Sequence, residues 1–258
     1  MPVASYEDYA RLAAAARQLA LEAGRTIMVF YRDGTPVETK ADCTPVTEAD
    51  RAADRIIVAG LLAADPGIPV ISEESTSTGP APAGGRFWLV DPLDGTREFI
   101  ARTGEFTVNI ALIEAGRPVV GVLHAPVQGE TYVADGMGGA VRIVGDGPPQ
   151  AIRARPVPAQ GPAVVASRLH RDAETNAYIA GLGAARTVSA GSALKFGLLA
   201  RGEADIYPRF GRTMEWDTAA GQAVLEAAGG HVRDLNGRTL SYGKAGFINP
   251  PFVASGAS

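Results

Sequence analysis

The sequence feature that most constrains the fold is residues 91–96, which read DPLDGT and follow an apolar run at 87–90. That run is rich in β-prone residues and predicts a strand. The proline fixes its own φ and removes a backbone donor, and the glycine permits a sharp reversal, so we expect a rigid turn. The turn places Asp91 and Asp94 close together, where their charges repel unless a cation lies between them. A hard divalent cation such as Mg²⁺ prefers oxygen ligands of this kind.

Two further acids stand at the edges of predicted elements. Glu73 follows a predicted strand at 68–71, and Asp217 stands at the start of a predicted helix at 218–228. Because strand ends and a helix N-terminus can converge, these acids could share two metal ions with the DPLDGT turn. Each also has a purely structural explanation, Glu73 as a solvated acid and Asp217 as a complement to the helix dipole. The spacing by itself therefore predicts a Mg²⁺ site and phosphoryl chemistry, but no particular substrate.

Composition excludes several classes of protein. The chain has 258 residues, enough for one large domain or two small ones, and its net charge of −4 offers no basic footprint for nucleic acid. Cys43 is the sole cysteine, which excludes an intrachain disulfide and a thiolate metal site. The N-terminus lacks a signal-peptide pattern, and apolar runs fall far short of the roughly 18 residues that a membrane span needs. We therefore expect no nucleic-acid partner and no integral membrane segment.

Two sequence patterns predict helix starts in the first quarter of the chain. Ser5-x-x-Asp8 and Thr47-x-x-Asp50 both have the form of a capping box. Gly24 is expected to weaken the first helix near its end, and an Asp-Pro-Gly sequence is expected to stop the second. Asp50 could serve only as the capping partner of Thr47, or it could also be part of a functional site.

The predicted secondary structure changes near the middle of the chain. Residues 106–144 predict several short strands joined by hairpin-like breaks. Residues 145–162 contain five prolines and three glycines, which makes them the expected boundary between two parts. We predict an N-terminal α+β part at 1–150, with an antiparallel sheet and most of the metal ligands, and a C-terminal α/β part at 151–258, with the substrate-binding residues and Asp217.

Three motifs, in this order, resemble the inositol monophosphatase superfamily of metal-dependent phosphatases. They read SEE at 72–74, DPLDGT at 91–96 and WDTAAG at 216–221, and the resemblance runs from about residue 36 to 250. It implies an α/β (α+β) fold, namely the layered αβαβα sandwich of the inositol monophosphatase and fructose-1,6-bisphosphatase type. The site is then expected between the two parts.

Within this superfamily the chain is most similar to the 3′(2′),5′-bisphosphate nucleotidases of the CysQ type. The similarity rests on REFI at 97–100, GEFTVNIAL at 104–112, SRLH at 167–170, GSALKF at 191–196 and YPRF at 207–210. It implies hydrolysis of the 3′-phosphate of adenosine 3′,5′-bisphosphate to AMP and phosphate by a metal-activated water, with the sulfated analogue as a further candidate substrate. This reaction belongs to sulfur metabolism, and lithium inhibition is expected.

Two alternatives remain open. An inositol- or sugar-phosphate monophosphatase of broad specificity would use the same metal chemistry. A Mg²⁺-dependent nucleotide-binding regulator without turnover is the alternative outside enzymes, although every expected catalytic position is occupied.

The resemblance assigns roles to individual positions. The implied metal ligands are Glu73, Asp91, the carbonyl of Leu93, Asp94 and Asp217. The implied catalytic residues are Asp50, Glu73 and Thr96, where Asp50 and Thr96 form a dyad that orients and deprotonates the water. The implied substrate contacts are Glu73, Leu93, Asp94, Gly95, Thr96, His170, Ser192, Lys195, Arg209 and Asp217. Lys195 and Arg209 can offset the charge of a second phosphate, although surface solubility would also explain them.

The same resemblance implies the cofactor and the cellular setting. We expect two or three Mg²⁺ ions and a small phosphorylated nucleotide as the substrate. The chain is expected to be a monomer or a homodimer in the cytoplasm, with peripheral attachment at the inner membrane as a variant of that location.

Overall fold

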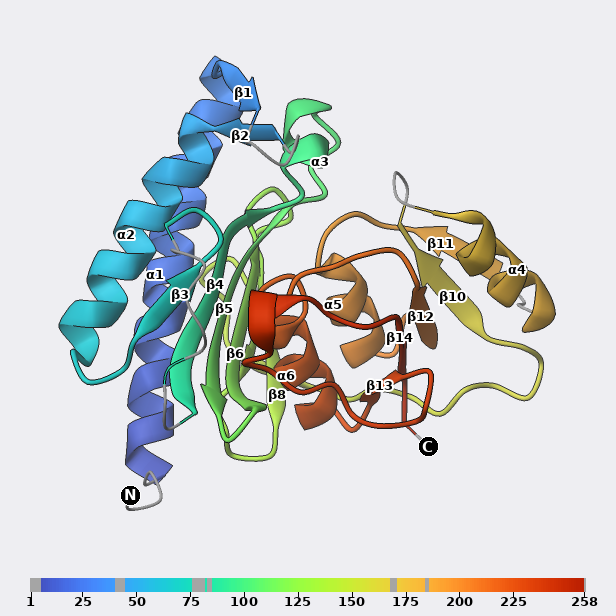
Figure 1. Ribbon diagram of the computed structural model, residues 1–258. Helices are drawn as coiled ribbons and strands as arrows, with labels where there is room; N and C mark the ends of the chain where they lie inside the picture. Colours follow the sequence, from blue (N-terminus) through green and yellow to red (C-terminus); the bar gives the residue numbers. More distant parts are fainter. Residues whose placement is uncertain are drawn as a thin grey trace.

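The helices and strands follow the predicted alternation of segments. The computed structural model describes residues 6–39, 45–75, 82, 85–167, 171–183 and 186–257 (Figure 1). Its helices are α1 (Tyr6–Asp33), α2 (Glu48–Ala64), α3 (Thr96–Ile100), α4 (Ala173–Gly181), α5 (Leu194–Ala200), α6 (Ala219–Ala227) and the 3₁₀ turn η1 (Ala245–Phe247). Within the described residues, no helix combines the length and the apolar character that a membrane span requires.

The strands form two large sheets and one small ribbon. The seven-stranded sheet has the order β3-β4-β5-β6-β7-β8-β9, and the five-stranded sheet has the order β11-β10-β12-β14-β13. The first sheet contains β3 (Val70–Ser72), β4 (Arg86–Asp94), β5 (Thr107–Glu114), β6 (Arg117–Ala125), β7 (Glu130–Ala134), β8 (Ala140–Val144) and β9 (Gln150–Ile152). The second contains β10 (Ala163–Ala166), β11 (Arg186–Ser189), β12 (Ile206–Arg209), β13 (His231–Asp234) and β14 (Phe252–Ser255). The ribbon pairs β1 (Val37–Thr39) with β2 (Pro45–Thr47).

These elements stack as five layers. Helices α1 and α2 pack on one face of the seven-stranded sheet, and α6 packs on its other face. Helix α5 joins α6 to the five-stranded sheet, and α4 contacts that sheet through β12 on the outer side (Figure 1). The layered αβαβα sandwich expected from the resemblance is confirmed.

Close packing of the middle layer depends on small residues. Gly121 of β6 faces α6, where an added Cβ would come within 2.6 Å of the carbonyl oxygen of Ala220. Gly221 of α6 faces the ring of Phe196 on α5, where an added Cβ would come within 2.3 Å of a ring carbon. Larger side chains at these positions would push the layers apart, because buried contacts are already at van der Waals distance.

The predicted capping box at the start of α2 is present. Thr47 accepts a hydrogen bond from Ala49 N, and the carboxylate of Asp50 accepts hydrogen bonds from both the backbone and the hydroxyl of Thr47. The corresponding cap of α1 cannot be placed, since Ser5 lies outside the described residues. Helix α2 ends before Asp65, as the Asp-Pro-Gly sequence predicted.

Helix α1 continues without a break through Gly24 to Asp33, and whether the glycine weakens it stays a prediction. Gly24 leaves room for a neighbour, because a Cβ there would come within 2.6 Å of the imidazole of His124 on β6. The helix tolerates the glycine because its buried face, which includes Ala20 and Ile27, packs firmly on the sheet.

Several elements differ from the prediction. The strand expected at 68–71 lies at Val70–Ser72, and the strand expected at 87–90 continues to Asp94. Strand β9 lies inside 145–162, which composition marked only as a boundary, and β13, β14 and α3 were not predicted. The first sheet draws its strands from 70–152 and the second from 163–255. The division at residue 150 into two parts stays a prediction.

Candidate active site

The DPLDGT turn is built by a change of register at the end of β4. Asp91 pairs with Asn109 of β5 and Asp94 pairs with Thr107, so the turn inserts an extra residue opposite β5. Asp91 folds back on the turn, where its Oδ1 accepts a hydrogen bond of 3.1 Å from Leu93 N. Gly95 then has a φ of 93° and begins α3; a Cβ there would be strained and would come within 3.2 Å of a backbone oxygen. The expected rigid turn is therefore present.

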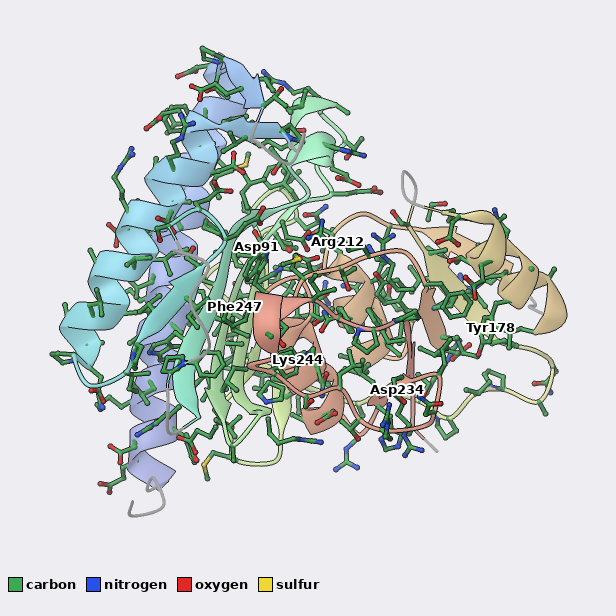
Figure 2. The ribbon with its side chains drawn as sticks, in the orientation of Figure 1. Asp91, Tyr178, Arg212, Asp234, Lys244 and Phe247 are labelled. Carbon is green, nitrogen blue, oxygen red and sulfur yellow. The ribbon has the colours of Figure 1, made fainter. Side chains whose placement is uncertain are left out.

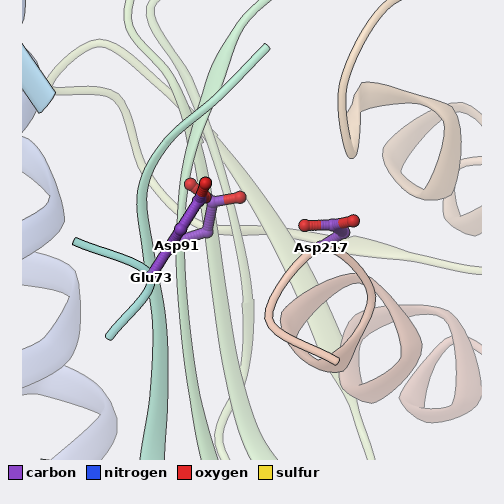
Figure 3. Close-up of side chains that lie close together, drawn as sticks. All are labelled: Glu73, Asp91 and Asp217. Atoms are coloured by element: carbon purple, nitrogen blue, oxygen red, sulfur yellow. The ribbon is translucent and has the colours of Figure 1, made fainter. Parts of the chain in front are cut away.

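Three acids from separate elements converge beside this turn. Glu73 follows β3, Asp91 lies near the end of β4, and Asp217 precedes α6; Figure 3 shows the first two side by side, with Asp217 facing them. One carboxylate oxygen from each lies within 4.8 Å of the others. Asp217 is held in place by a hydrogen bond of 2.8 Å from Met214 N to its Oδ2.

The electrostatics of these three acids favour a bound cation. Burial, followed by the charges of the neighbouring acids, raises the pKa of Asp91 well above its ordinary value. Burial raises the pKa of Asp217 in the same way, with Asp94 and Glu73 as the neighbouring charges. Closely spaced carboxylates of this kind are stable in the ionised form only with positive charge between them. A set of hard oxygen donors fits Mg²⁺.

Asp94 lies beside these three acids and is fixed by a separate set of donors. Its Oδ2 accepts hydrogen bonds of 2.7 Å from Ser192 Oγ, 2.7 Å from Ala193 N and 3.3 Å from Asn109 Nδ2. Ser192 and Ala193 belong to the turn before α5, and Asn109 belongs to β5. Asp94 is therefore oriented by β5 of the first sheet and by the turn before α5.

Thr96, the last residue of the turn, is hydrogen-bonded to Asp50 at the start of α2. Thr96 Oγ1 donates to Asp50 Oδ1 at 3.0 Å and lies 3.3 Å from the carbonyl oxygen of Leu93. Asp50 is 1% exposed and uses its other oxygen in the capping box of α2. Burial raises the pKa of Asp50, although hydrogen bonds from Thr47 and Thr96 act in the opposite direction. Asp50 is thus both the capping partner and the neighbour of Thr96.

Most of the predicted site residues line a cleft of about 610 Å³. Figure 2 places Asp91, Arg212 and Phe247 near the middle of the molecule. The predicted residues that line the cleft are Glu73, Asp91, Leu93, Asp94, Gly95, Thr96, Ser192, Lys195, Arg209 and Asp217. Asp50 lies behind Thr96, and His170 lies outside the described residues. The volume suits a small organic ligand.

The cationic side of the cleft comes from α5, from the end of β12 and from the loop that follows β12. Lys195 is 4% exposed, and its Nζ donates to the carbonyl oxygen of Ser192 at 2.5 Å and lies 5.1 Å from the ring centre of Tyr207. Burial lowers the pKa of Lys195 to about 8. Arg209 Nη2 donates to the carbonyl oxygen of Arg212 at 3.2 Å, and both arginines line the cleft. Phosphate groups would meet positive charge here.

A model of the inositol monophosphatase family matches residues 8–255. The chain belongs to this family. It consists of metal-dependent phosphatases, and the group of Glu73, Asp91 and Asp217 is where a metal could be held.

Individual members of the inositol monophosphatase family are similar over almost the whole chain. The 3′(2′),5′-bisphosphate nucleotidase CysQ of Escherichia coli (strain K12) is 49% identical over 250 residues, which cover 92% of this chain and 97% of that protein. The protein of the same name from Salmonella typhimurium is 49% identical over 240 residues, which cover 91% and 96%. The crystal structure of CysQ from Bacteroides thetaiotaomicron has a TM-score of 0.80 at 39% identity and covers 95% of this chain and 97% of that one.

The family site also contains side chains that sequence reasoning did not single out. Glu98 of α3 is 2% exposed and lines the cleft, and burial raises its pKa. Trp216 and Phe247 line the cleft with ring centres 5.9 Å apart. Glu98 and Trp216 stand inside the quoted motifs, but a motif does not say which of its side chains face the ligand. Phe247 had no local signal.

Proposed function

We propose that this protein hydrolyses the 3′-phosphate of adenosine 3′,5′-bisphosphate, giving AMP and phosphate, in a reaction that depends on Mg²⁺. The sulfated analogue of this nucleotide is a second proposed substrate. The observation that carries the proposal is the meeting of three acids, a Thr96–Asp50 pair and two cationic side chains in one cleft. The similarity of 49% to bisphosphate nucleotidases over 92% of the chain supports this choice of substrate.

The residues proposed to hold the metal ions are Glu73, Asp91 and Asp217, together with Asp94 and the carbonyl of Leu93. Divalent cations bound there would supply positive charge that stabilises the phosphoryl oxygens and makes water a better nucleophile. The proteinʼs own contribution is to bring these oxygens together before the substrate arrives. Burial raises the pKa of two of these acids, Asp91 and Asp217, which favours the binding of a cation over two bare charges.

Thr96 and Asp50 are proposed to receive the proton of the attacking water. Thr96 lines the cleft and Asp50 lies behind it, with a hydrogen bond of 3.0 Å between them. A water that donates to Thr96 Oγ1 would pass its proton along this bond to Asp50 Oδ1. Because burial raises the pKa of Asp50, its carboxylate is a stronger base than an exposed one.

The second phosphate of the substrate is proposed to lie near Lys195 and Arg209. Arg209 can bind phosphate oxygens with two parallel N–H donors. The amine of Lys195 is directed at backbone carbonyls, so it contributes mainly through its charge. Arg212 lines the same side of the cleft and adds a third positive charge. This positive side would favour a bisphosphate over a substrate with one phosphate.

The first test is phosphate release in Mg²⁺, with adenosine 3′,5′-bisphosphate, inositol 1-phosphate and fructose 1,6-bisphosphate at equal concentration. We expect a preference in kcat/KM of about a hundredfold for the nucleotide, which corresponds to about 2.7 kcal/mol of transition-state discrimination. Comparable rates on all three would leave the metal chemistry in place and refute the nucleotide assignment.

The second test concerns the metal site. Asp91→Asn keeps the shape of the side chain and removes one charge, and we expect kcat to fall by about a hundredfold or more. The matched control is Asp135→Asn, which changes an acid that caps a turn through Met137 N and does not line the cleft. Phosphatase activity that survives Asp91→Asn unchanged would contradict the site assignment.

A further inference from the structure

Two polar residues on β5 remain unexplained by the proposed reaction. Thr107 and Asn109 are two positions apart, so their side chains lie on the same face of the strand. Val108 and Ile110, on the other face, pack into the core with α1 and α2. Thr107 is 0% exposed and Asn109 is 1% exposed. Buried polar groups of this kind are kept for their hydrogen bonds.

The hydrogen bonds of these two residues lead to Asp94. Asn109 Nδ2 donates to Asp94 Oδ2 at 3.3 Å. Thr107 Oγ1 lies 2.9 Å from Asn109 Oδ1 and 2.5 Å from Ser192 Oγ, and Ser192 Oγ in turn donates to Asp94 Oδ2 at 2.7 Å. The hydroxyl of Thr107 therefore contacts both side-chain donors to Asp94, and it donates its hydrogen to Asn109 Oδ1.

The orientation of the amide follows from this arrangement. If the amide of Asn109 were flipped, its oxygen would face the carboxylate of Asp94, which would repel it. With the amide nitrogen toward Asp94, the oxygen points at Thr107 and accepts its hydroxyl. The Thr107 hydroxyl thus stabilises the amide orientation that Asp94 requires.

The turn that contributes Ser192 is itself held in an unusual conformation. Ser192 has a φ of +53°, in the left-handed region that residues other than glycine rarely adopt. Its carbonyl oxygen accepts a hydrogen bond from Lys195 Nζ, and the next residue, Ala193, donates its N–H to Asp94 Oδ2. The turn and the carboxylate therefore hold each other in place.

We propose that Thr107 and Asn109 are positioning residues for Asp94. Together with the turn at Ser192 and Ala193, they place three donors on Oδ2 of Asp94, so the carboxylate is kept in one rotamer and presents Oδ1 on its other side. The inference rests on the proposed function, because it takes Asp94 as a metal ligand. Groups that orient a ligand in this way typically change metal affinity by about 10–100-fold when they are lost.

The test compares two substitutions of Thr107 with opposite consequences. Thr107→Val keeps the shape and removes the hydroxyl, whereas Thr107→Ser keeps the hydroxyl and removes a methyl group. The probe is Mn²⁺ alone, titrated without substrate, with the free ion measured by electron paramagnetic resonance. We expect Thr107→Val to weaken Mn²⁺ binding about tenfold and Thr107→Ser to bind within about twofold of the wild type. A packing role would give the reverse, with valine harmless and serine damaging.

Two further variants keep the test decisive. Thr131→Val is the matched control, because Thr131 is also a buried threonine in the same sheet, with a hydroxyl 2.9 Å from His124 Nδ1, and it does not line the cleft. It should bind Mn²⁺ like the wild type. Asn109→Ala removes the direct donor and should weaken binding about tenfold, even if Thr107→Val does not fold.

The outcomes separate the inference from the proposed function. Wild-type affinity in both Thr107→Val and Asn109→Ala would overturn the positioning role while leaving the phosphatase assignment intact. A wild-type protein that binds no Mn²⁺ would overturn both.

Discussion

His124 makes the stability of this protein depend on pH. It lies on β6 and is 6% exposed, with its Nδ1 2.9 Å from Thr131 Oγ1 and with α1 packed on its ring at Gly24. Burial lowers the pKa of His124 from 6.5 to about 4, and the charges of Arg17 and Arg25 on α1 act in the same direction. The folded protein therefore keeps this imidazole neutral in a pH range where the unfolded chain protonates it.

The sign and size of the effect follow from these two values. Between pH 6.5 and about 4 the unfolded chain binds a proton that the folded protein does not, so stability falls as the pH falls through this window. From pH 7.5 to pH 5 the free energy of unfolding should decrease by about 2 kcal/mol through His124 alone. The full loss of about 3 kcal/mol is reached below pH 4.

Urea unfolding of the wild type and of His124→Gln, at pH 7.5 and at pH 5, measures this contribution. The variant will be less stable at pH 7.5 because the ring no longer packs against α1. Between pH 7.5 and pH 5, the free energy of unfolding of the variant should fall by about 2 kcal/mol less than that of the wild type. The carboxylates are common to both proteins, so their contributions cancel in this comparison. His231→Gln is the control and should retain the contribution of His124. Equal losses in the wild type and His124→Gln would refute the argument that burial keeps this imidazole neutral.

Two more predictions concern the site. Asp50→Asn removes the proposed proton acceptor behind Thr96 and should lower kcat by about a hundredfold or more, while Mn²⁺ affinity stays within roughly twofold. A loss of affinity as large as the loss of kcat would argue against the proposed role. Gly191→Ala should destabilise the fold by about 1–3 kcal/mol in urea unfolding, because its Cβ would come within 2.7 Å of the backbone oxygen of Glu105. The control is Gly181→Ala, where a Cβ has no neighbour within 4 Å, and an equal cost at both positions would show that the close approach is unimportant.

The local chemistry of the site was predictable from the sequence because the turn imposes it. A proline and a glycine flank Leu93 and Asp94 and leave the backbone few conformations. Residues 91–96 therefore fix the positions of Asp91 and Asp94 by themselves. The contacts of Lys195 were not predictable in the same way. A lysine in a sequence gives no sign of whether its amine faces a ligand or, as here, the carbonyl of Ser192.

Two of the strands that were not predicted, β13 and β9, have a common physical cause. Strand β13 reads HVRD and contains only one buried residue, Val232, so it carries little of the hydrophobic pattern that marks a strand. It forms because β14 pairs with it in register from His231 to Asp234. Strand β9 is three residues long and likewise depends on its pairing with β8. Pairing with a neighbouring strand, and not local preference, decides such strands.

The double use of Asp50 has a consequence for the rate of each turnover. One of its oxygens closes the cap of α2 and the other reaches Thr96, so a single rotamer satisfies both. The side-chain freedom that Asp50 would have to lose in its proposed role as proton acceptor is therefore lost when the protein folds. That entropy loss belongs to folding and does not recur in the catalytic cycle, where it would otherwise add to the activation barrier.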